Sequence, residues 1–295
     1  MAVPKPKMGI HLSKYGTKEW FEQMFSDALH GVDGWGHQWR ASQQYRYKLS
    51  LSAIGSVLSQ QTPQSILDIG CGLGDFSNLV YTVNSKNSIY GMDISENAIK
   101  DAQRMYRHIE FRTTALPDIA YMRQFDGIIA LDCLYYLTED DRIHAAENIF
   151  DHLNPKGWFL FSSPLDGGNR YFSEKGAIYL LEHVGFLCQS VFFNHAKIFS
   201  KVERPLLRIF DLDRIIAEIE SSPLYRLTRK KKLLFNVIHV PMLGYAIKKI
   251  VALLKNLSNR ILESVTIIKC FQVFSRFVFK ESSKSHIIVL AKKDE

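Results

Sequence analysis

The chain has 295 residues, of which 46% are hydrophobic, 23% are charged and 12% are aromatic. This composition is typical of a globular protein with one large or two modest domains, and it excludes low-complexity disorder, a collagen-like fibre and a small disulfide-rich scaffold. The formal net charge is +7, and the excess is local, because residues 226–260 hold nine of the 37 basic residues and no acidic one. The other 28 basic residues are balanced by 30 acidic ones, so the rest of the chain is nearly neutral.

Cysteine spacing and hydropathy indicate a reducing, aqueous compartment. The four cysteines are scattered without a C-x-x-C pair, which argues against a structural zinc site and a disulfide framework. The longest apolar stretch, residues 233–247, is shorter than the roughly 20 residues that a membrane-spanning helix needs. Residues 1–20 lack the apolar core of a signal peptide. We therefore expect a cytoplasmic protein with no bound metal and no transmembrane helix.

The predicted elements begin with two helices, at residues 17–30 and 41–60. From residue 65 to residue 193, strand-like runs alternate with helix-like runs, which is typical of a parallel, doubly wound sheet. Ser95 and Ser173 are expected to cap two of the helices, and the NPKG run at 154–157 is expected to form a turn. The strands are predicted at 65–69, 88–92, 109–112, 125–131, 158–162 and 186–193, and the helices at 75–83, 95–106, 139–153 and 173–185.

A helical insertion is predicted before the last strand. Residues 200–283 read as helical, without strand-helix alternation, and residues 286–291 (HIIVLA) then return to a strand pattern. The predicted fold class is therefore α/β, with a doubly wound, mostly parallel sheet of seven strands. We predict an N-terminal helical lid at 1–60, a main domain formed by 61–199 together with 284–295, and the insertion at 200–283.

A glycine cluster marks the first strand-to-helix junction. The run LDIGCGLG occupies residues 67–74, and glycines there allow positive φ angles and let a ligand approach the backbone closely. Asp93 lies 19 residues beyond Gly74, at the end of the next predicted strand. A carboxylate at that point can accept hydrogen bonds from the hydroxyls of a ribose. The pattern predicts a nucleoside ligand across the carboxyl ends of the first two strands.

The acidic residues around the glycine cluster narrow the kind of nucleoside. A dinucleotide fingerprint requires glycine where this chain has Asp75, and an acid at a helix start opposes a pyrophosphate. The lysine and Ser/Thr of a nucleoside triphosphate loop are also absent from this run. With Asp68 and Asp93, three acids surround the loop, which favours a cationic nucleoside without phosphates.

These residues resemble a known family. The LDIGCGLG run with Asp93 resembles motifs I and II of class I S-adenosylmethionine-dependent methyltransferases. FDGIIALDCLYYL at 125–137 resembles the fourth-strand motif of that family, with Tyr136 where many members have histidine, and NPKGW at 154–158 resembles the turn before strand five. The resemblance covers about residues 66–193 and the final strand. It implies a Rossmann-like fold and S-adenosylmethionine as the cofactor.

The resemblance also implies roles for individual residues. In that family the glycine loop lies along the methionine part of the cofactor, the acid of the first motif supports the amino group, and the acid after strand two binds the ribose. The acid that is common after strand three is replaced here by TTA at 113–115, where Thr114 is the candidate for the adenine amino group. The predicted cofactor-binding residues are Asp68, Gly70, Cys71, Gly72, Gly74, Asp93, Ile94, Thr114, Ala115 and Leu131.

The methyl acceptor is expected over the ends of strands four and five. Asp132 is the first candidate for a base that removes the proton of an acceptor hydroxyl, and Tyr136 is a second catalytic candidate. The alternatives are that Asp132 only caps a helix or bonds the backbone, and that the tyrosines at 135 and 136 are pocket walls. Aromatic residues of the lid either cover the ligands or belong to the core: Trp35, Trp39, Tyr45 and Tyr47.

Acceptor class is narrowed by absent motifs and by a second, looser resemblance. The chain lacks the D/N/S-P-P-Y/F motif of nucleobase amino methylases after strand four, and it lacks a Pro-Cys nucleophile. DGW at 33–35, YRYK at 45–48 and LYYL at 134–137 are loosely similar to the nodulation methyltransferases that N-methylate chitooligosaccharides. This similarity favours a sugar or glycan acceptor over a protein. The predicted acceptor group is a hydroxyl or amine of a small molecule, a sugar or glycan, or, because of the basic insertion, a lipid-linked compound.

The basic insertion suggests a partner. In residues 246–261, six apolar residues share one helical face, and cationic residues flank it, as an interfacial anchor on anionic lipid requires. The predicted partner is an anionic membrane surface that is contacted through residues 226–261, and the expected location is the cytoplasm, peripheral on the inner face of the membrane. The alternatives are that the apolar face packs on the sheet, that the cations bind RNA in an RNA methyltransferase, or that the chain is a non-catalytic cofactor-binding subunit that holds a partner.

Overall fold

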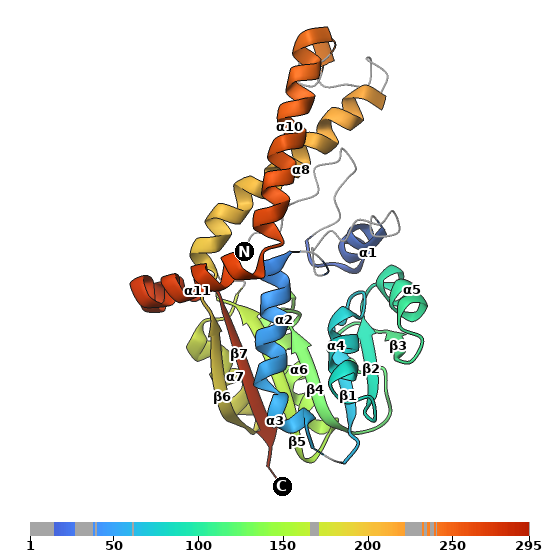
Figure 1. Ribbon diagram of the computed structural model, residues 1–295. Helices are drawn as coiled ribbons and strands as arrows, with labels where there is room; N and C mark the ends of the chain where they lie inside the picture. Colours follow the sequence, from blue (N-terminus) through green and yellow to red (C-terminus); the bar gives the residue numbers. More distant parts are fainter. Residues whose placement is uncertain are drawn as a thin grey trace.

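The computed structural model describes residues 15–26, 38, 40–60, 62–165, 171–221, 232, 235–236, 239 and 241–294. Its centre is the predicted sheet of seven strands, in the order β3-β2-β1-β4-β5-β7-β6 (Figure 1). β7 pairs antiparallel with both of its neighbours, and the pairs between β3 and β5 are parallel. The strands are β1 (Ser65–Ile69), β2 (Ser88–Asp93), β3 (Glu110–Thr113), β4 (Phe125–Leu131), β5 (Leu153–Pro164), β6 (Phe186–Asn194) and β7 (His286–Lys293).

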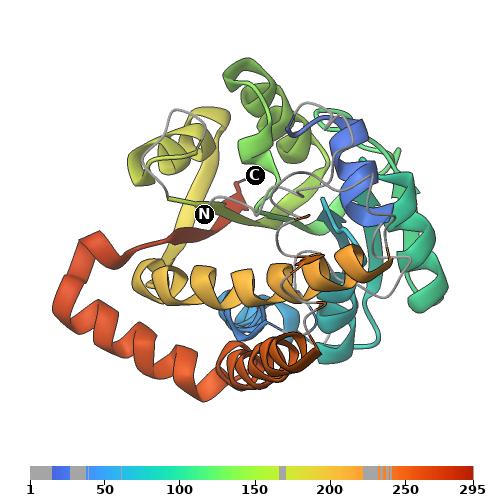
Figure 2. The same cartoon turned by 90° about the horizontal axis from the view of Figure 1, so that it is seen from above.

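Helices cover both faces of this sheet (Figure 2). Because side chains alternate along a strand, β5 sends Phe159 and Phe161 to one face and Trp158 and Leu160 to the other. The first pair packs beneath α6 (Glu139–Asp151) and α7 (Glu174–Val184), whose apolar residues belong to the same cluster. The second pair packs beneath α2 (Ala41–Ala53), α3 (Gly55–Leu58), α4 (Asp75–Val83) and α5 (Glu96–Met105). Two apolar layers, one on each face, therefore hold the central strands.

Local signals place most of these elements. Ser95 accepts a hydrogen bond from the amide of Ala98, and Ser173 accepts one from the amide of Gly176, so both predicted helix caps are confirmed. The predicted helix at 41–60 is two helices, which divide at Ile54.

The run 154–157, predicted to form a turn before the strand, is assigned to β5, but the regular pairing is interrupted there. Phe125 pairs with Leu153 and Gly127 with Trp158, so the register between β4 and β5 shifts across this run. Fully buried Leu153 pairs with Phe125 at the start of the strand, and the side chain of Asn154 donates to Asp126 at 2.8 Å. The chain absorbs the irregularity at Lys156, whose φ is 65°. The predicted break in regular structure is therefore present, as an irregularity inside β5 rather than as a turn before it.

The helical insertion lies between β6 and β7, as predicted. α8 (Lys197–Ser221) begins beyond the carboxyl end of β6, and α10 (Pro241–Leu262), α11 (Val265–Phe279) and η4 (Lys280–Ser283) lead to β7. α8 and α10 form an arm that rises from the edge of the sheet where the parallel strands end, and α11 lies across the base of the arm (Figure 1). The division of the chain into domains at residues 60, 199 and 284 stays a prediction.

Buried polar contacts fix the insertion to the sheet domain. Glu203 of α8 is 2% exposed and bonds the guanidinium of Arg40 at 2.8 Å and the hydroxyl of Ser42 at 2.5 Å. Gln272 of α11 donates to the side chain of Asn194 and accepts from the amide of His195 at 2.6 Å. Among the described residues, no helix is long and apolar enough to cross a membrane.

Candidate active site

The glycine loop between β1 and α4 closes against two neighbouring strands. The amides of Gly70 and Cys71 donate to the carbonyl of Met92 at 2.7 and 3.0 Å, which ties the loop to the end of β2. Gly70 has a φ of 68°, and a Cβ added there would lie 2.7 Å from the Cβ of Cys133. Glycine is therefore required at this position by both backbone conformation and space. Gly72 and Gly74 also have positive φ angles, of 55° and 81°.

Two buried carboxylates lie beside the loop. Asp93 accepts from the amide of Gly72 at 3.0 Å and from the amide of Ser95 at 2.9 Å, and Asp68 accepts from the hydroxyl of Ser77 at 2.6 Å. Burial raises the pKa of Asp68 to about 7, with a further rise from the charge of Asp93, and burial raises the pKa of Asp93 to about 6. A cation held here would restore the charged form of both groups. An anion would be repelled.

The remaining predicted cofactor residues lie along the same edge of the sheet. The amide of Thr114 donates to the carbonyl of Asp93 at 2.9 Å, and the Thr114 hydroxyl donates to Thr113 at 2.7 Å. A hydroxyl that donates one hydrogen bond can still accept another, and the predicted contact with the adenine amino group requires an acceptor. Ile94 and Thr114 are half-buried, Ala115 is exposed, and Leu131 is half-buried at the end of β4. Their roles stay predictions.

The N-terminal helix α1 (Lys18–Ser26) is held at this edge by a contact that the sequence did not reveal. The carboxylate of Glu22 accepts from the amide of Glu96 at 2.6 Å, from the amide of Asn97 at 3.1 Å and from the hydroxyl of Ser95 at 2.9 Å. A carboxylate that bonds these amides caps α5 and complements its dipole. The same helix places the ring of Phe25 3.5 Å from the position of a Cβ on Gly72.

The aromatic residues predicted to cover the ligands have different surroundings. Tyr47 is 8% exposed and its ring packs on Phe76 at 5.1 Å, while Tyr45 packs against the cluster of Phe199 and Ile268. Both therefore belong to the core, which was the alternative interpretation. Trp35 and Trp39 lie outside the described residues.

Tyr136 lies in an aromatic cluster with α1. Its ring centroid is 4.9 Å from that of Phe21, 5.5 Å from that of Tyr15 and 4.2 Å from that of Tyr135. Burial raises the pKa of Tyr136 well above its ordinary value, which disfavours a tyrosinate base. These surroundings favour a wall of the site, and a catalytic role for Tyr136 stays a prediction.

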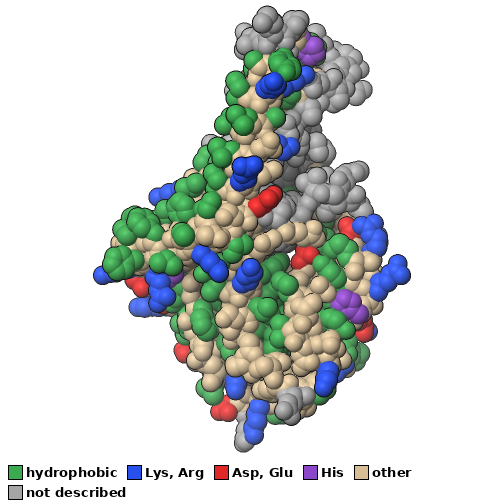
Figure 3. Space-filling model, in the orientation of Figure 1, with side chains coloured by type: hydrophobic (Ala, Val, Ile, Leu, Met, Phe, Trp, Pro, Cys, Tyr) green, Lys and Arg blue, Asp and Glu red, His purple; other side chains and the backbone are tan. Residues whose placement is uncertain are grey.

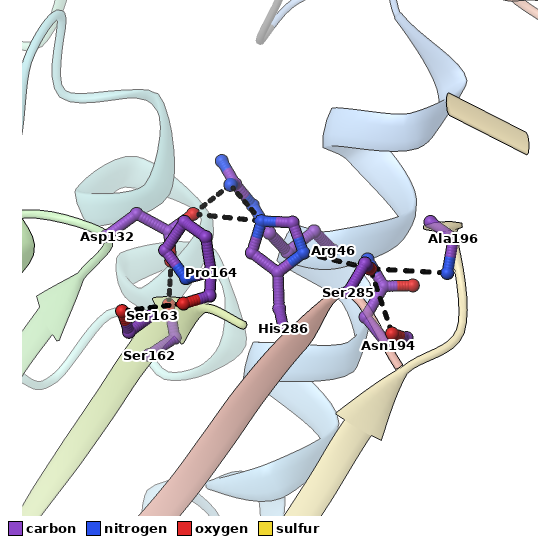
Figure 4. Close-up of polar contacts among 9 residues, drawn as sticks. All are labelled: Arg46, Asp132, Ser162, Ser163, Pro164, Asn194, Ala196, Ser285 and His286. Carbon is purple, nitrogen blue, oxygen red and sulfur yellow. Dashed lines mark hydrogen bonds and ion pairs between the residues drawn. The ribbon is translucent and has the colours of Figure 1, made fainter. Parts of the chain in front are cut away.

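Asp132 joins a polar cluster that we define as Arg46, Asp132, Ser162 and His286 (Figure 4). The Asp132 carboxylate accepts from the hydroxyl of Ser162 at 2.7 Å, forms an ion pair with Arg46, and lies 3.7 Å from Nε2 of His286. The φ of Asp132 is 53°, an uncommon conformation for a residue other than glycine. Asp132 as the base stays a prediction, because the ion pair equally suits a group that orients others.

The hydrogen bonds around His286 fix its tautomer. The hydroxyl of Ser285 donates to the carbonyl of Asn194 at 2.9 Å, and it accepts from the amide of Ala196 at 3.2 Å. Since that hydroxyl has one proton, Nδ1 of His286 at 3.0 Å must be the donor to it. Nε2 of the neutral ring then carries the lone pair, and it lies 3.5 Å from the guanidinium of Arg46, which can only donate.

The polar cluster and the glycine loop lie next to each other. Cys133 follows Asp132 in the chain, contacts the Gly70 position, and directs its thiol to the carbonyl of Ile69 at 3.6 Å. Arg46 and His286 were missed by sequence analysis, because they lie on α2 and on the last strand without a recognisable motif. No group of three or more metal-ligating side chains occurs in the described part of the chain.

The sheet order, the glycine loop and the acid after β2 define a Rossmann-like fold of the class I methyltransferase type. Residues 39–202 match the family described as methyltransferase domain. The chain belongs to this family, as the sequence motifs predicted.

Individual relatives agree with this assignment. The nodulation protein S of Bradyrhizobium diazoefficiens is 26% identical over 51% of this chain and 71% of its own length. The O-methyltransferase resE of Aspergillus sclerotiorum is 31% identical over 35% of this chain, which spans only 40% of the length of that relative. The structure of the N-methyltransferase NodS from Bradyrhizobium japonicum, in complex with S-adenosylhomocysteine, has a TM-score of 0.50 at 21% identity. The match covers 59% of this chain and 89% of the NodS chain.

Proposed function

We propose that the protein is an S-adenosylmethionine-dependent methyltransferase that modifies a hydroxyl or amine of a small-molecule, sugar, glycan or lipid-linked acceptor. Membership of the methyltransferase domain family supports the reaction, and the complex of NodS with S-adenosylhomocysteine supports the cofactor. The observation that carries the proposal is the pair of buried acids, Asp68 and Asp93, against a glycine loop.

The loop suits this cofactor for electrostatic reasons. S-adenosylmethionine carries a sulfonium and an ammonium group and no phosphate, so it matches a site whose two buried carboxylates have raised pKa values. The bound cofactor supplies a methyl group on a cationic sulfur. The chain holds the ammonium near Asp68 and the ribose hydroxyls at Asp93, and Phe25 of α1 limits access of water to the loop.

The polar cluster is the proposed acceptor side. Methyl transfer requires the acceptor atom to be aligned and, for a hydroxyl, to lose its proton. Asp132, which is half-buried at the end of β4, is the proposed base for that proton, and buried His286, whose Nε2 lies 3.7 Å from the carboxylate, can share the proton with it. Arg46 positions Asp132 through their ion pair.

Two observations support the proposed acceptor class: the names of the relatives and the basic insertion. One relative is named an O-methyltransferase and another an N-methyltransferase, so both hydroxyl and amine acceptors stay within the proposal. The preference for a glycan or lipid-linked acceptor rests on the looser similarity to nodulation methyltransferases and on the basic insertion.

The experiment compares matched variants on extracted acceptors. Envelope lipids and glycans from cells that lack the active protein are incubated with the purified protein and isotope-labelled S-adenosylmethionine, and labelled products are identified by mass spectrometry. We expect His286→Asn and Asp132→Asn to lower kcat at least about 100-fold while cofactor affinity is retained. His183→Asn and Asp151→Asn are the controls, since both residues are exposed and lie at the ends of α7 and α6, before the amino ends of β6 and β5 and so away from the edge that holds the glycine loop. Equal activity in all four variants would remove the polar cluster from the mechanism.

A further inference from the structure

α10 has two apolar faces, and only one of them is used for packing. Val251 and Leu262 are buried, and Val251 packs on Ile216 of α8. A second apolar stripe, centred about a third of a turn away, is exposed to solvent, with Leu253 69% exposed. Its members are Ile250, Leu253, Leu254 and Leu257. Exposed apolar side chains that are contiguous along a helix usually mark an interaction surface.

α11 continues this surface with an apolar outer face. The helix buries Ile268 together with two polar residues, Gln272 and Ser275. Its opposite side presents Val273, 71% exposed, and Phe277, 84% exposed. Phe274, Val278 and Phe279 are also exposed. Polar residues inside and phenylalanines outside reverse the usual pattern of a surface helix.

Positive charge accompanies both apolar faces. Residues 241–280 contain seven basic residues and one acidic residue, Glu263. Lys248, Lys249 and Arg276 are exposed. Figure 3 shows hydrophobic side chains gathered over α11 and along α10, with basic side chains among them. We call the exposed residues of α10 and α11 the outer surface.

The combination of chemistry and shape favours one occupant. An anionic bilayer takes up apolar side chains below its headgroups and attracts lysine and arginine at its surface. A protein partner fits less well, because lysines are depleted at protein interfaces, and RNA offers no apolar environment for leucine and valine. The outer surface is also part of a projecting arm, which can contact a flat membrane (Figure 1).

We propose that the outer surface of α10 and α11 docks the protein on an anionic lipid membrane. The helices lie in the plane of the headgroups, with Phe274, Phe277 and Leu253 below them and the cations at the level of the phosphates. The arm rises from the edge of the sheet that holds the glycine loop and the polar cluster, so the docking surface and the candidate active site belong to the same end of the molecule (Figure 1). The proposal does not rest on methyl transfer, because docking is measured without cofactor.

The test is sedimentation of the full chain with vesicles. We expect binding to vesicles that contain about one third phosphatidylglycerol, and at least tenfold weaker binding to vesicles of phosphatidylcholine alone. Phe274→Ser with Phe277→Ser should weaken binding to the anionic vesicles at least about tenfold, and Lys248→Glu with Lys249→Glu should do so as well. The substituted side chains are exposed, so the fold is retained; circular dichroism verifies this.

Matched controls lie on the sheet domain. Tyr179→Ser removes a side chain that is 66% exposed on α7, and Lys86→Glu reverses an exposed charge between α4 and β2. Neither should change vesicle binding. Absence of vesicle binding, equal binding to both vesicle types, or equal losses in the control variants would overturn the proposal. Binding to RNA in place of vesicles would overturn it too, and methyl-transfer assays are not needed for either result.

Discussion

Phenylalanines are used in opposite ways in the sheet domain and in the arm. Phe125, Phe159 and Phe161 of the sheet have no exposed surface, whereas Phe274 and Phe277 of α11 are 55% and 84% exposed. In the sheet domain, burial of such rings stabilises the fold. In α11 the buried face is small and partly polar, so the exposed rings contribute little to folding. The difference supports the proposal that the exposed apolar residues of α11 contact a surface outside the chain.

Removal of one phenylalanine ring from each region tests whether the rings of the sheet stabilise the fold and those of α11 do not. Phe161→Ala should lower the free energy of unfolding by about 4 kcal/mol, because it leaves a cavity among packed strands and helices. Phe277→Ala should lower it by less than about 0.5 kcal/mol. Urea denaturation of both variants measures the two values. Similar losses would mean that α11 packs its outer face in solution.

The second prediction concerns the joint between the two regions. Glu203→Ala removes a buried carboxylate that bonds the guanidinium of Arg40 and the hydroxyl of Ser42, and we expect the free energy of unfolding to fall by about 3 kcal/mol, because both buried bonds are lost. Hydrogen exchange in residues 197–206 should increase most. Glu203→Gln keeps the shape and part of the bonding and should cost less. An unchanged exchange rate in this segment would show that the arm is held in another way.

The third prediction compares alanine substitutions at two glycines, one in the glycine loop and one outside it. Gly70→Ala should lower the free energy of unfolding by about 2 kcal/mol and abolish cofactor binding, because the added methyl group meets Cys133 at a positive φ. Gly55→Ala meets no atom within 4 Å and is the matched control, which should be neutral or slightly stabilising. Thermal unfolding and cofactor titration check both variants. Retained binding in Gly70→Ala would contradict the assigned path of the cofactor.

The smallest expected effect is the pH dependence of the glycine loop. The pKa values of Asp68 and Asp93 in the folded protein are about 7 and about 6, above the ordinary value of 3.8. Between about pH 4 and about pH 7 the folded protein therefore holds more protons than the unfolded chain. Stability without cofactor should therefore fall as pH rises through this window. Affinity for the cationic cofactor should rise, by about tenfold from about pH 5 to about pH 6. Asp68→Asn should flatten both profiles; an unaffected profile in that variant would exclude Asp68 as their source.

The order of strands and helices could be predicted because each signal was local. Buried parallel strands are short apolar runs, and Ser95 and Ser173 cap helices through bonds that span three residues. The glycine loop was recognisable because Gly70 must adopt a conformation that other residues avoid.

Contacts between distant segments could not be predicted. His286 reaches Asp132 because β7 runs antiparallel beside β5, and Arg46 reaches the same carboxylate from α2. No pattern of residue spacing in the sequence predicts either contact. The helical wheel of α10 likewise placed Val251 and Leu257 on one face, yet only Val251 is buried, since the position of α8 decides which side packs.

Calorimetric titration with S-adenosylmethionine and S-adenosylhomocysteine tests the central claim most directly. The wild-type protein should bind both, and Asp93→Ala should bind them at least about 100-fold more weakly, since it loses the acceptor for the ribose and the bond that holds the Gly72 amide. Circular dichroism must show that the variant is folded. Absence of binding by the wild-type protein, or equal affinity in folded Asp93→Ala, would contradict the account.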